Sequence, residues 1–378
     1  MKSNLSNICD YVKGRIDVSE LDYRTYISTE NMLPNKGGIT DASSLPTTIQ
    51  TQAFMTGDVL VSNIRPYFKK IWFADFDGGC SNDVLVFRAK EGVNKRFLYY
   101  VLADDTFFDY SMATSKGTKM PRGDKTSIIQ YEVLNFSFEN QEKIAGMLEA
   151  LDKKIQLNNK INNNLLEQME SLYKAWFIDF IPFGGNRPVD WQKSDVYSIA
   201  NIIYGAPFAS KLFNTDGEGI PIIRIRDLKE QAFVTYTTEN HPKGHLIKPG
   251  DIVVGMDGEF RPYIWGNTEA WLNQRVCIFE NKRPKGKAFV LFTISPLLYQ
   301  IEQTQVATTV IHIGKKDYDA FEFYLPDNNT LNQYDGITSP MIDQIVVNSL
   351  ENKRLAALRD SLLPQLMSGE LDVSNLDL

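Results

Sequence analysis

Two stretches of the chain carry apolar side chains at the spacing of a long helix that packs against another helix. Between about 139 and 178 the apolar positions alternate in steps of four and three residues, proline is absent and glycine occurs once. This alternation is typical of supercoiling helices. A second stretch, from about 338 to 368, repeats the pattern at an offset of 190 residues. The predicted contact positions are Leu151, Ile155, Asn158, Asn162 and Leu165 in the first helix, and Ile345, Asn348, Asn352, Leu355 and Leu362 in the second.

Each contact series contains two asparagines, and the two pairs occupy matching positions. Polar residues in such a series lower stability but fix the register and the partner of a helix. Two chance polar positions in exposed helices are the alternative interpretation. If the helices pair antiparallel about a midpoint near residue 160, Asn158 lies opposite Asn352 and Asn162 lies opposite Asn348, which we predict. Only Arg359 interrupts the match between the two series.

The sequence that precedes each helix is rich in short β-like runs, and these runs also repeat. The offset is about 190 to 193 residues throughout. A duplicated pattern of this kind predicts two similar globular domains. The repeated segments are Gly57-Asp58-Val59-Leu60-Val61 with Gly250-Asp251-Ile252-Val253-Val254, Val84-Leu85-Val86-Phe87 with Val276-Cys277-Ile278-Phe279, and Lys95-Arg96-Phe97-Leu98 with Lys287-Ala288-Phe289-Val290.

These patterns predict an α+β protein with a pseudo-two-fold internal repeat. Its two globular domains of mixed helix and strand are joined by two long antiparallel coiled-coil helices. A length of 378 residues exceeds what one hydrophobic core usually supports, in agreement with two domains. The expected organisation is a first domain over 1–138, a first helix over 139–180, a linker over 181–189, a second domain over 190–330 and a second helix over 338–370.

Charge and cysteine content limit the ligands and the cellular compartment that are expected for the protein. The formal net charge of −7 argues mildly against tight DNA binding by the chain alone, because such proteins are usually basic. Three scattered cysteines predict neither a disulfide framework nor a zinc site. The chain has no run of 18 apolar residues, and its N-terminus lacks the apolar core of a secretion signal. We therefore expect a cytoplasmic protein without a membrane partner.

Catalytic motifs are not recognisable in the sequence. It contains no phosphate-binding loop, no glycine-rich dinucleotide turn and none of the aromatic-flanked Asn-Pro-Pro or Asp-Pro-Pro tetrapeptides of amino-group methyltransferases. His241 and His245 have the spacing of metal ligands, but Pro242 and Gly244 between them disfavour a helix. A binding function is therefore favoured over catalysis, with no metal and no cofactor expected.

Basic and amide side chains occur in likely turns of both domains and form a candidate nucleic-acid surface. Arginine, asparagine and glutamine can contact guanine or adenine edges in pairs of hydrogen bonds, whereas lysine mostly contacts phosphates. A solvated surface charge is the alternative for each of them. The candidates are Asn63, Arg65, Lys69, Lys116, Lys119 and Arg122 in the first domain, and Arg224, Arg226, Arg261, Asn273, Gln274 and Arg275 in the second.

Several sequence motifs of the chain resemble motifs of the specificity subunit of type I restriction-modification systems. Asn140-Gln141-Glu142-Lys143-Ile144 is similar to the start of the first helix in that family. Ser171-Leu172-Tyr173-Lys174-Ala175-Trp176-Phe177-Ile178-Asp179-Phe180 resembles the end of the family's first helix, and Leu362-Leu363-Pro364-Gln365-Leu366-Met367-Ser368-Gly369-Glu370-Leu371 resembles its C-terminal end. Gly205-Ala206-Pro207-Phe208 resembles the opening of a recognition domain. The first domain lacks a clear copy of this last phrase; Val12-Lys13-Gly14-Arg15 is a poor substitute.

The resemblance implies that each domain is a target recognition domain for one half of a bipartite site in double-stranded DNA. The helices would set the spacer between the half-sites and help to bind two modification subunits, which methylate adenine with S-adenosylmethionine. Restriction subunits, ATP-dependent translocases that cut DNA, would complete the complex. The chain itself would catalyse nothing. Two other functions stay open: a coiled-coil scaffold with two protein-binding heads, or an enzyme with an unrecognised site in a β-domain.

Overall fold

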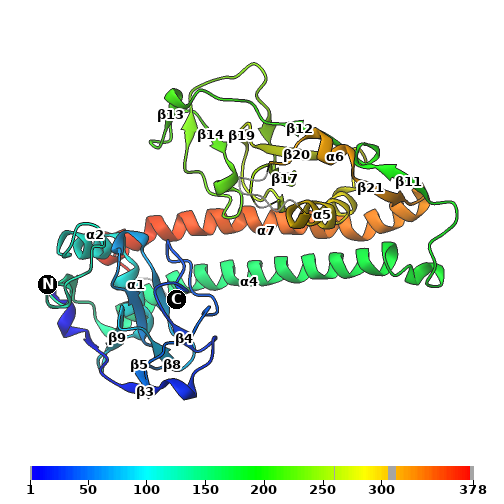
Figure 1. The fold of residues 1–378 in the computed structure, drawn as a ribbon. Helices are drawn as coiled ribbons and strands as arrows, with labels where there is room; N and C mark the ends of the chain where they lie inside the picture. Colours follow the sequence, from blue (N-terminus) through cyan, green and yellow to red (C-terminus); the bar gives the residue numbers. More distant parts are fainter. Residues whose placement is uncertain (1, 259, 305–311, 375–378) are drawn as a thin grey trace. The chain divides into compact units, whose positions relative to one another are not determined.

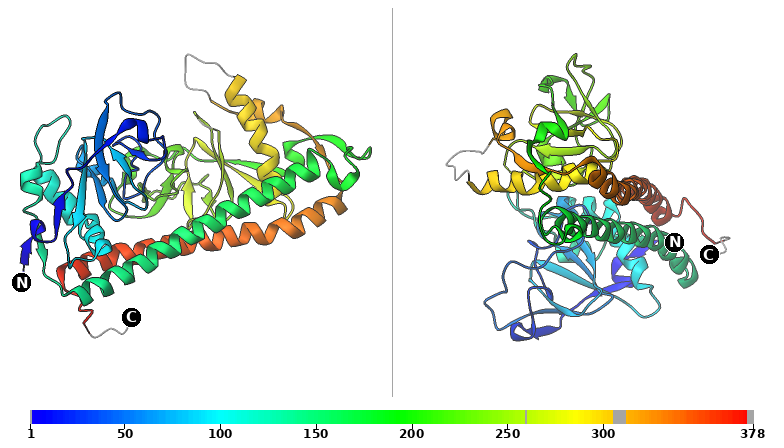
Figure 2. Two further views of the ribbon diagram at one scale, coloured as in Figure 1. Left: turned by 90° about the horizontal axis from the view of Figure 1, so that it is seen from below. Right: turned by 90° about the vertical axis from the view of Figure 1, so that its right-hand side faces the viewer.

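The computed structural model describes residues 2–258, 260–304 and 312–374. Its fold is drawn in Figure 1, and two further views are given in Figure 2. The chain divides into two compact units, one formed by 1–153 together with 355–378 and the other by 154–354. Both boundaries fall inside the two long helices, so each unit contains one globular domain and a section of each helix.

The first domain is built from three small sheets and three helices. Their strand orders are β2-β9-β6-β7, β3-β5-β8-β4 and β1-β10. The strands are β1 (Lys2–Asn4), β2 (Cys9–Tyr11), β3 (Arg15–Asp17), β4 (Tyr26–Ile27), β5 (Gln50–Phe54), β6 (Val59–Ser62), β7 (Ile71–Phe73), β8 (Gly78–Cys80), β9 (Val84–Ala89) and β10 (Glu132–Leu134). The helices are α1 (Lys95–Ala103), α2 (Asp105–Ala113) and α3 (Lys125–Ile128).

The second domain has a similar plan, with one five-stranded sheet in place of a four-stranded one. Its sheets have the orders β12-β20-β17-β18, β13-β15-β14-β19-β16 and β11-β21. The strands are β11 (Gln192–Asp195), β12 (Ala200–Tyr204), β13 (Phe213–Asn214), β14 (Ile220–Ile223), β15 (Tyr236–Thr237), β16 (Leu246–Ile247), β17 (Ile252–Gly255), β18 (Pro262–Ile264), β19 (Ala270–Leu272), β20 (Val276–Asn281) and β21 (Glu322–Leu325). The helices are α5 (Lys287–Thr304) and α6 (Lys315–Asp319).

The internal repeat predicted from the sequence is confirmed most closely in one sheet of each domain. The four-stranded sheet β2-β9-β6-β7 corresponds to β12-β20-β17-β18, and all of its neighbouring strands are antiparallel in both domains. Each domain also has one parallel pair at the same place, β4 with β8 and β14 with β19. A parallel pair needs a long connection between its strands, so its presence in both domains points to a shared topology.

The repeated Gly-Asp dipeptide makes the same turn in both domains. Gly57 and Gly250 have φ angles of 93° and 86°, a backbone conformation that glycine adopts at little cost. The following carboxylate closes the turn by accepting a backbone N–H three residues earlier, at 2.8 Å from Met55 to Asp58 and 2.7 Å from Lys248 to Asp251. The dipeptide is therefore repeated because the backbone needs it.

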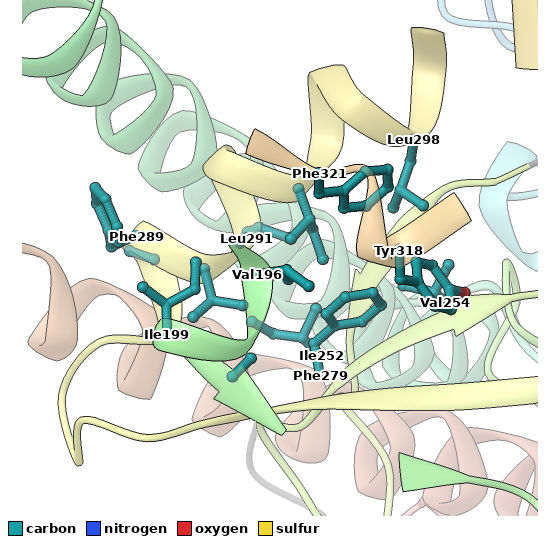
Figure 3. Close-up of a cluster of buried hydrophobic side chains, with 14 of the residues drawn as sticks. Val196, Ile199, Ile252, Val254, Phe279, Phe289, Leu291, Leu298, Tyr318 and Phe321 are labelled. Carbon is teal, nitrogen blue, oxygen red and sulfur yellow. The ribbon is translucent and has the colours of Figure 1, made fainter. Parts of the chain in front are cut away.

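The core of the second unit lies between the four-stranded sheet and the helices of that domain. Figure 3 shows Ile252 and Phe279 from the sheet near Leu291 of α5 and Tyr318 of α6. The first unit has a corresponding core in which strands β6 and β9 pack against α1 and α2. Helix α5 is continuous through Pro296, whereas α1 and α2 are separated at the equivalent residue, Asp104, whose side chain caps α2.

Two helices of 40 and 41 residues, α4 (Phe138–Phe177) and α7 (Asn328–Ser368), follow the domains. At 1.5 Å per residue each is about 60 Å long. Helix α7 begins ten residues before the predicted start at 338, because Asp327 caps its first turn and Leu331 and Tyr334 are buried in the core. The asparagines and glycine of this first section are weak helix formers, so the sequence pattern did not predict it as helix.

The predicted linker is partly ordered by aromatic contacts. Residues Ile181–Phe183 form a short 3-10 turn, and the rings of Phe183 and Trp191 lie 5.3 Å apart. Among the residues that the structure describes, no helix combines the length and apolar content needed to cross a lipid bilayer.

Candidate nucleic-acid interface

The predicted asparagine pairing is present in the second unit. The side-chain amide of Asn158 donates to Oδ1 of Asn352 at 2.9 Å, and that of Asn348 donates to Oδ1 of Asn162 at 2.8 Å. Residue numbers rise along one helix as they fall along the other, so these sections of α4 and α7 run antiparallel. The alternative, two chance polar residues in exposed helices, is wrong, since Asn158 and Asn348 are at most 4% exposed.

Further hydrogen bonds extend this asparagine ladder. Asn158 also donates to Glu351 at 2.7 Å, and Asn352 donates to Asn159 at 2.8 Å. Asn162 donates to the hydroxyl of Ser349 at 3.2 Å. A slipped register would leave these buried amides without partners, which costs more than an apolar mismatch does. The ladder therefore fixes the alignment of the two helices.

The helix positions that were predicted to form the contact between the two helices are all at least half-buried in the structure. Leu151, Leu355 and Leu362 belong to the first unit, and Ile155, Leu165 and Ile345 belong to the second with the four asparagines. Arg359, which interrupts the apolar match, donates to Asp152 at 2.8 Å in the first unit. The hydroxyl of Tyr100 donates to the same carboxylate at 2.7 Å.

The structure brings two groups of first-domain candidates together. The backbone N–H of Arg65 donates to Pro121 at 2.8 Å, and that of Gly123 donates to Asn63 at 3.0 Å. Within the second loop, Lys116 and Arg122 exchange two backbone hydrogen bonds of 2.9 and 3.0 Å. The loop of residues 114–124 is therefore held against the segment after β6.

The side chains of these candidates differ in exposure. Lys116 and Lys119 are exposed, and Lys116 pairs with Asp124. Lys69 instead forms an ion pair of 2.8 Å with Asp105 at the start of α2. Asn63 is 5% exposed, and its Oδ1 atom has no partner among the described residues. Lysines 116 and 119 thus have the accessible positions that phosphate contacts need.

Two turns of the second domain also lie side by side. The N–H of Asn273 donates to the carbonyl of Ile223 at 3.2 Å, which places the β19–β20 turn beside residues 224–226. Arg226 has 70% of its side chain exposed, and Gln274 is exposed as well. Arg224 is turned inward and binds Asp227 and Thr235, so it has a structural role.

The remaining arginine candidates are held by carboxylates. Arg261 forms a two-fold contact with Glu302 of helix α5, one of its bonds measuring 3.1 Å. Arg275 lies 3.6 Å from Asp257 and contacts the ring of His312 at 3.2 Å. The His312 ring is itself 2.6 Å from Asp257. In the first domain, Arg122 donates to Asp83.

Asp83, Asp257 and His312 were not candidates from the sequence. An acidic residue repels phosphates, so the sequence alone gave no reason to include Asp83 or Asp257 in a DNA surface. The repeat offset offered a signal, because Asp83 and Arg275 occupy the same turn of the two domains. The partner of each arginine, however, comes from a distant part of the sequence.

The phrase Gly205-Ala206-Pro207-Phe208 follows strand β12 and is held by the β19–β20 turn. The N–H of Gly205 donates to Val276 at 3.0 Å and that of Ala206 to Leu272 at 3.1 Å. A Cβ atom on Gly205 would lie 2.0 Å from the carbonyl oxygen of Asn273. At Gly14, which follows the corresponding strand β2, the nearest side-chain atom would be 3.6 Å away. The first domain therefore lacks this close backbone contact.

Burial shifts the pKa of several titratable groups. Burial raises the pKa of the thiols of Cys9, Cys80 and Cys277 to about 12, so none is a thiolate nucleophile at neutral pH. Burial also raises the pKa of Asp251 and of Asp335, the latter opposed by Arg283. Asp335 lines a surface cavity of about 500 Å³ whose other polar residues are Lys282, Arg283, Lys285 and Asn332. In the described part of the chain, no three His, Cys, Asp or Glu residues are grouped as metal ligands would be.

The family model and the relatives that match the chain all describe the same kind of protein. The model of the type I restriction modification DNA specificity domain matches the chain twice, over residues 1–167 and 188–358. The chain is 25% identical to the type I restriction enzyme MjaIX specificity subunit of Methanocaldococcus jannaschii over 309 residues, which are 76% of this chain and 71% of that protein. It is 21% identical to the HindI specificity subunit of Haemophilus influenzae over 97% of this chain and 98% of the relative.

Similarity to the EcoBI specificity subunit of Escherichia coli is higher, at 37%, but covers 33% of this chain and 27% of the relative. Among solved structures, the S subunit of a type I restriction-modification system from M. genitalium matches with a TM-score of 0.57 and 15% identity, over 97% of this chain and 96% of that one. This likeness concerns the fold. Because the family model covers most of the chain in two copies, the protein belongs to the family of type I restriction-modification DNA specificity proteins.

Proposed function

We propose that this chain is the non-catalytic specificity subunit of a type I restriction-modification complex, with each domain recognising one half of a bipartite DNA site. The observation that carries the proposal is the duplication of one recognition-type fold, combined with two helices aligned by a buried asparagine ladder. Two copies of one fold suit two half-sites, and a helix pair of fixed register suits a fixed spacer between them.

The ladder also supports a two-fold arrangement of the half-sites. Under the offset of 190 residues, Asn158 corresponds to Asn348 and Asn162 to Asn352. The pair Asn158–Asn352 therefore becomes the pair Asn348–Asn162, which is the second rung of the same ladder. Exchange of the two rungs is the property of a local two-fold axis. We infer that the two domains approach DNA as the two halves of a dimer would.

Exposed apolar residues on the helices support the binding of two equivalent partner subunits. Leu157 and Val347 are separated by the repeat offset of 190 residues, and they are 53% and 58% exposed. Apolar side chains that stay exposed on a helix surface are available for contacts with a partner protein. We assign these positions to two modification subunits, whose own charges would complement the acidic total of this chain. Restriction subunits would join the resulting complex.

The test is a genome-wide map of adenine methylation in the native cell, with and without this chain. The proposal predicts one bipartite motif that disappears when the chain is deleted and returns when it is supplied again. Affinity purification of the full chain should also recover a methyltransferase subunit. Methylation that is independent of the chain, or a purified chain with scaffold partners but no methyltransferase, would contradict the proposal.

A further inference from the structure

The two domains share a small polar cluster at the same place in the fold. In the first domain, an isolated bridge joins Ile64 to Arg122, and the β8–β9 turn supplies Asp83. In the second domain, the equivalent bridge joins Asp257 to His312, and the equivalent β19–β20 turn supplies Arg275. Offsets of 190 to 193 residues relate Arg122 to His312, Ile64 to Asp257 and Asp83 to Arg275.

The charges of this cluster are inverted between the domains. Asp83 on the first turn accepts a hydrogen bond from Arg122 on the bridge. Arg275 on the second turn is held from the bridge by Asp257, at 3.6 Å, and by His312, at 3.2 Å. Each domain thus has one arginine and one carboxylate across the same gap, but the arginine comes from opposite sides of it. The bridge and the turn that carry these residues are the same in both domains.

Both arginines remain accessible to a ligand. Their side chains are 56% and 53% exposed, whereas the structural arginines Arg224 and Arg283 are 22% and 25% exposed. A guanidinium has five N–H donors, and Asp83 engages one terminal nitrogen of Arg122. The other donors can serve a planar partner. A carboxylate that holds the side chain also lowers the entropy lost when the partner binds.

We propose that Arg122 in the first domain and Arg275 in the second are guanine-recognising residues, positioned by Asp83 and by Asp257 with His312. This inference rests on the proposed function and names the residues that carry it out. A guanidinium can donate two parallel hydrogen bonds to O6 and N7 of guanine in the major groove. Because the arginine projects from the bridge in one domain and from the turn in the other, one shared fold would place its guanine differently in each half-site.

Neighbouring residues have the chemistry that this role needs. Lys116 pairs its backbone with Arg122 and is exposed, as is Lys119, so both can contact phosphates beside the base. Tyr67, on the turn after Arg65, is 48% exposed. In the second domain, the exposed Gln274 directly precedes Arg275 and can contact an adenine edge.

The experiment maps adenine methylation directed by the full chain, expressed with its modification subunits, for the variants Arg122→Ala and Arg275→Ala. Each variant is expected to relax the requirement for a guanine in one half-site and to leave the other half-site and the spacer unchanged. Adenine methylation at sites with another base at that position should rise by roughly ten- to a hundred-fold relative to sites with guanine. Arg122→Lys and Arg275→Lys, which keep the charge and the fold, should relax the same positions because lysine cannot make the paired contact.

Asp83→Asn tests the positioning role. It should weaken discrimination at the same base as Arg122→Ala does, but to a smaller extent. Arg24→Ala is the matched control, because Arg24 is an exposed arginine of the first domain that pairs with a carboxylate, Asp41, outside the cluster. It should leave the motif unchanged.

The outcomes separate the two levels of the proposal. If the wild-type chain directs a bipartite motif and the arginine variants keep both half-sites at full discrimination, this inference is wrong and the proposed function stands. If both arginine variants reduce methylation at all sites equally, the arginines contact only phosphates and the inference is again wrong. If the wild-type chain directs no bipartite motif, the proposed function itself fails.

Discussion

The turn before strand β6 is the same in both domains, whereas the turn before strand β9 differs between them. The first turn has the same residues in both domains, Gly57-Asp58 and Gly250-Asp251, because its backbone needs a positive φ angle and a closing carboxylate. The second turn has Asp83 in one domain and Arg275 in the other, at equivalent places in the sheet. Residues that build the fold are shared between the repeats, and residues that face solvent at the polar cluster are not.

The strongest difference in stability is expected at the glycine that follows strand β2 in the first domain and β12 in the second. Gly205→Ala should lower the free energy of unfolding by about 3 kcal/mol or more, because the new Cβ would meet the Asn273 carbonyl at 2.0 Å. Gly14→Ala should change it by less than about 1 kcal/mol, since its nearest side-chain atom is 3.6 Å away. Urea unfolding followed by circular dichroism measures both. Equal effects would show that the two domains do not differ at this point.

The two ends of the helix pair offer the second comparison. In the first unit, Asp152 accepts from Arg359 and Tyr100, whereas the equivalent positions in the second unit are the apolar Ile342, Met169 and Phe292. Asp152→Ala should lower the free energy of unfolding by about 2 to 3 kcal/mol, because a partly buried guanidinium loses its main partner.

The triple variant Tyr100→Phe, Asp152→Ile, Arg359→Met copies the apolar end and should stay within about 1 kcal/mol of the wild type. Denaturant unfolding of the single and triple variants gives the comparison. A triple variant as unstable as Asp152→Ala would mean that the polar residues are needed for packing and not only for one another.

The carboxylates of the repeated Gly-Asp turn should respond differently to loss of charge. Arg88 makes two hydrogen bonds of 2.7 Å to Asp58, so Asp58→Asn should lower the free energy of unfolding by about 2 kcal/mol at neutral pH. Burial raises the pKa of Asp251. Asp251→Asn keeps an acceptor for the Lys248 N–H and should leave stability unchanged or slightly higher.

The pH dependence at Asp251 follows from the direction of its shift. A raised pKa in the folded state means that the protonated form is favoured there. This contribution to stability is fully present below the unfolded pKa, roughly 3.9, and is lost as the pH rises through the folded value. Any gain from Asp251→Asn should therefore appear at neutral pH and vanish in acid. A gain that persists below pH 4 would contradict the assignment.

The smallest effect on stability is expected at the exposed apolar residues of the helices. Leu157→Asp and Val347→Asp should each change the free energy of unfolding by less than about 0.5 kcal/mol, since both side chains are more than half exposed. Each variant should nevertheless lose one of two bound modification subunits, which light scattering of the purified complex measures. Retention of both subunits would remove these residues from the interface.

Much of the fold could be predicted from the sequence, because periodicity and duplication depend on local spacing. The pairing of Asn158 with Asn352 followed from the repeat offset once the helices were taken to be antiparallel about a midpoint near residue 160. The start of α7 at Asn328 did not, because weak helix formers there are stabilised by tertiary packing. The candidate surface was harder to predict than the fold. Arg224 binds Asp227 and Lys69 binds Asp105, and no sequence pattern reveals which carboxylate an arginine or lysine will contact.

The helix pair as a ruler between two recognition domains is tested most directly by lengthening it. One heptad inserted after Lys153 and one after Arg354 fall at the boundaries between the two units, so both rungs of the ladder stay inside the second unit and the register is kept. Seven residues add about 10 Å, or roughly three base pairs of DNA. Methylation mapping should then give the same two half-sites with a longer spacer. An unchanged spacer would contradict the account.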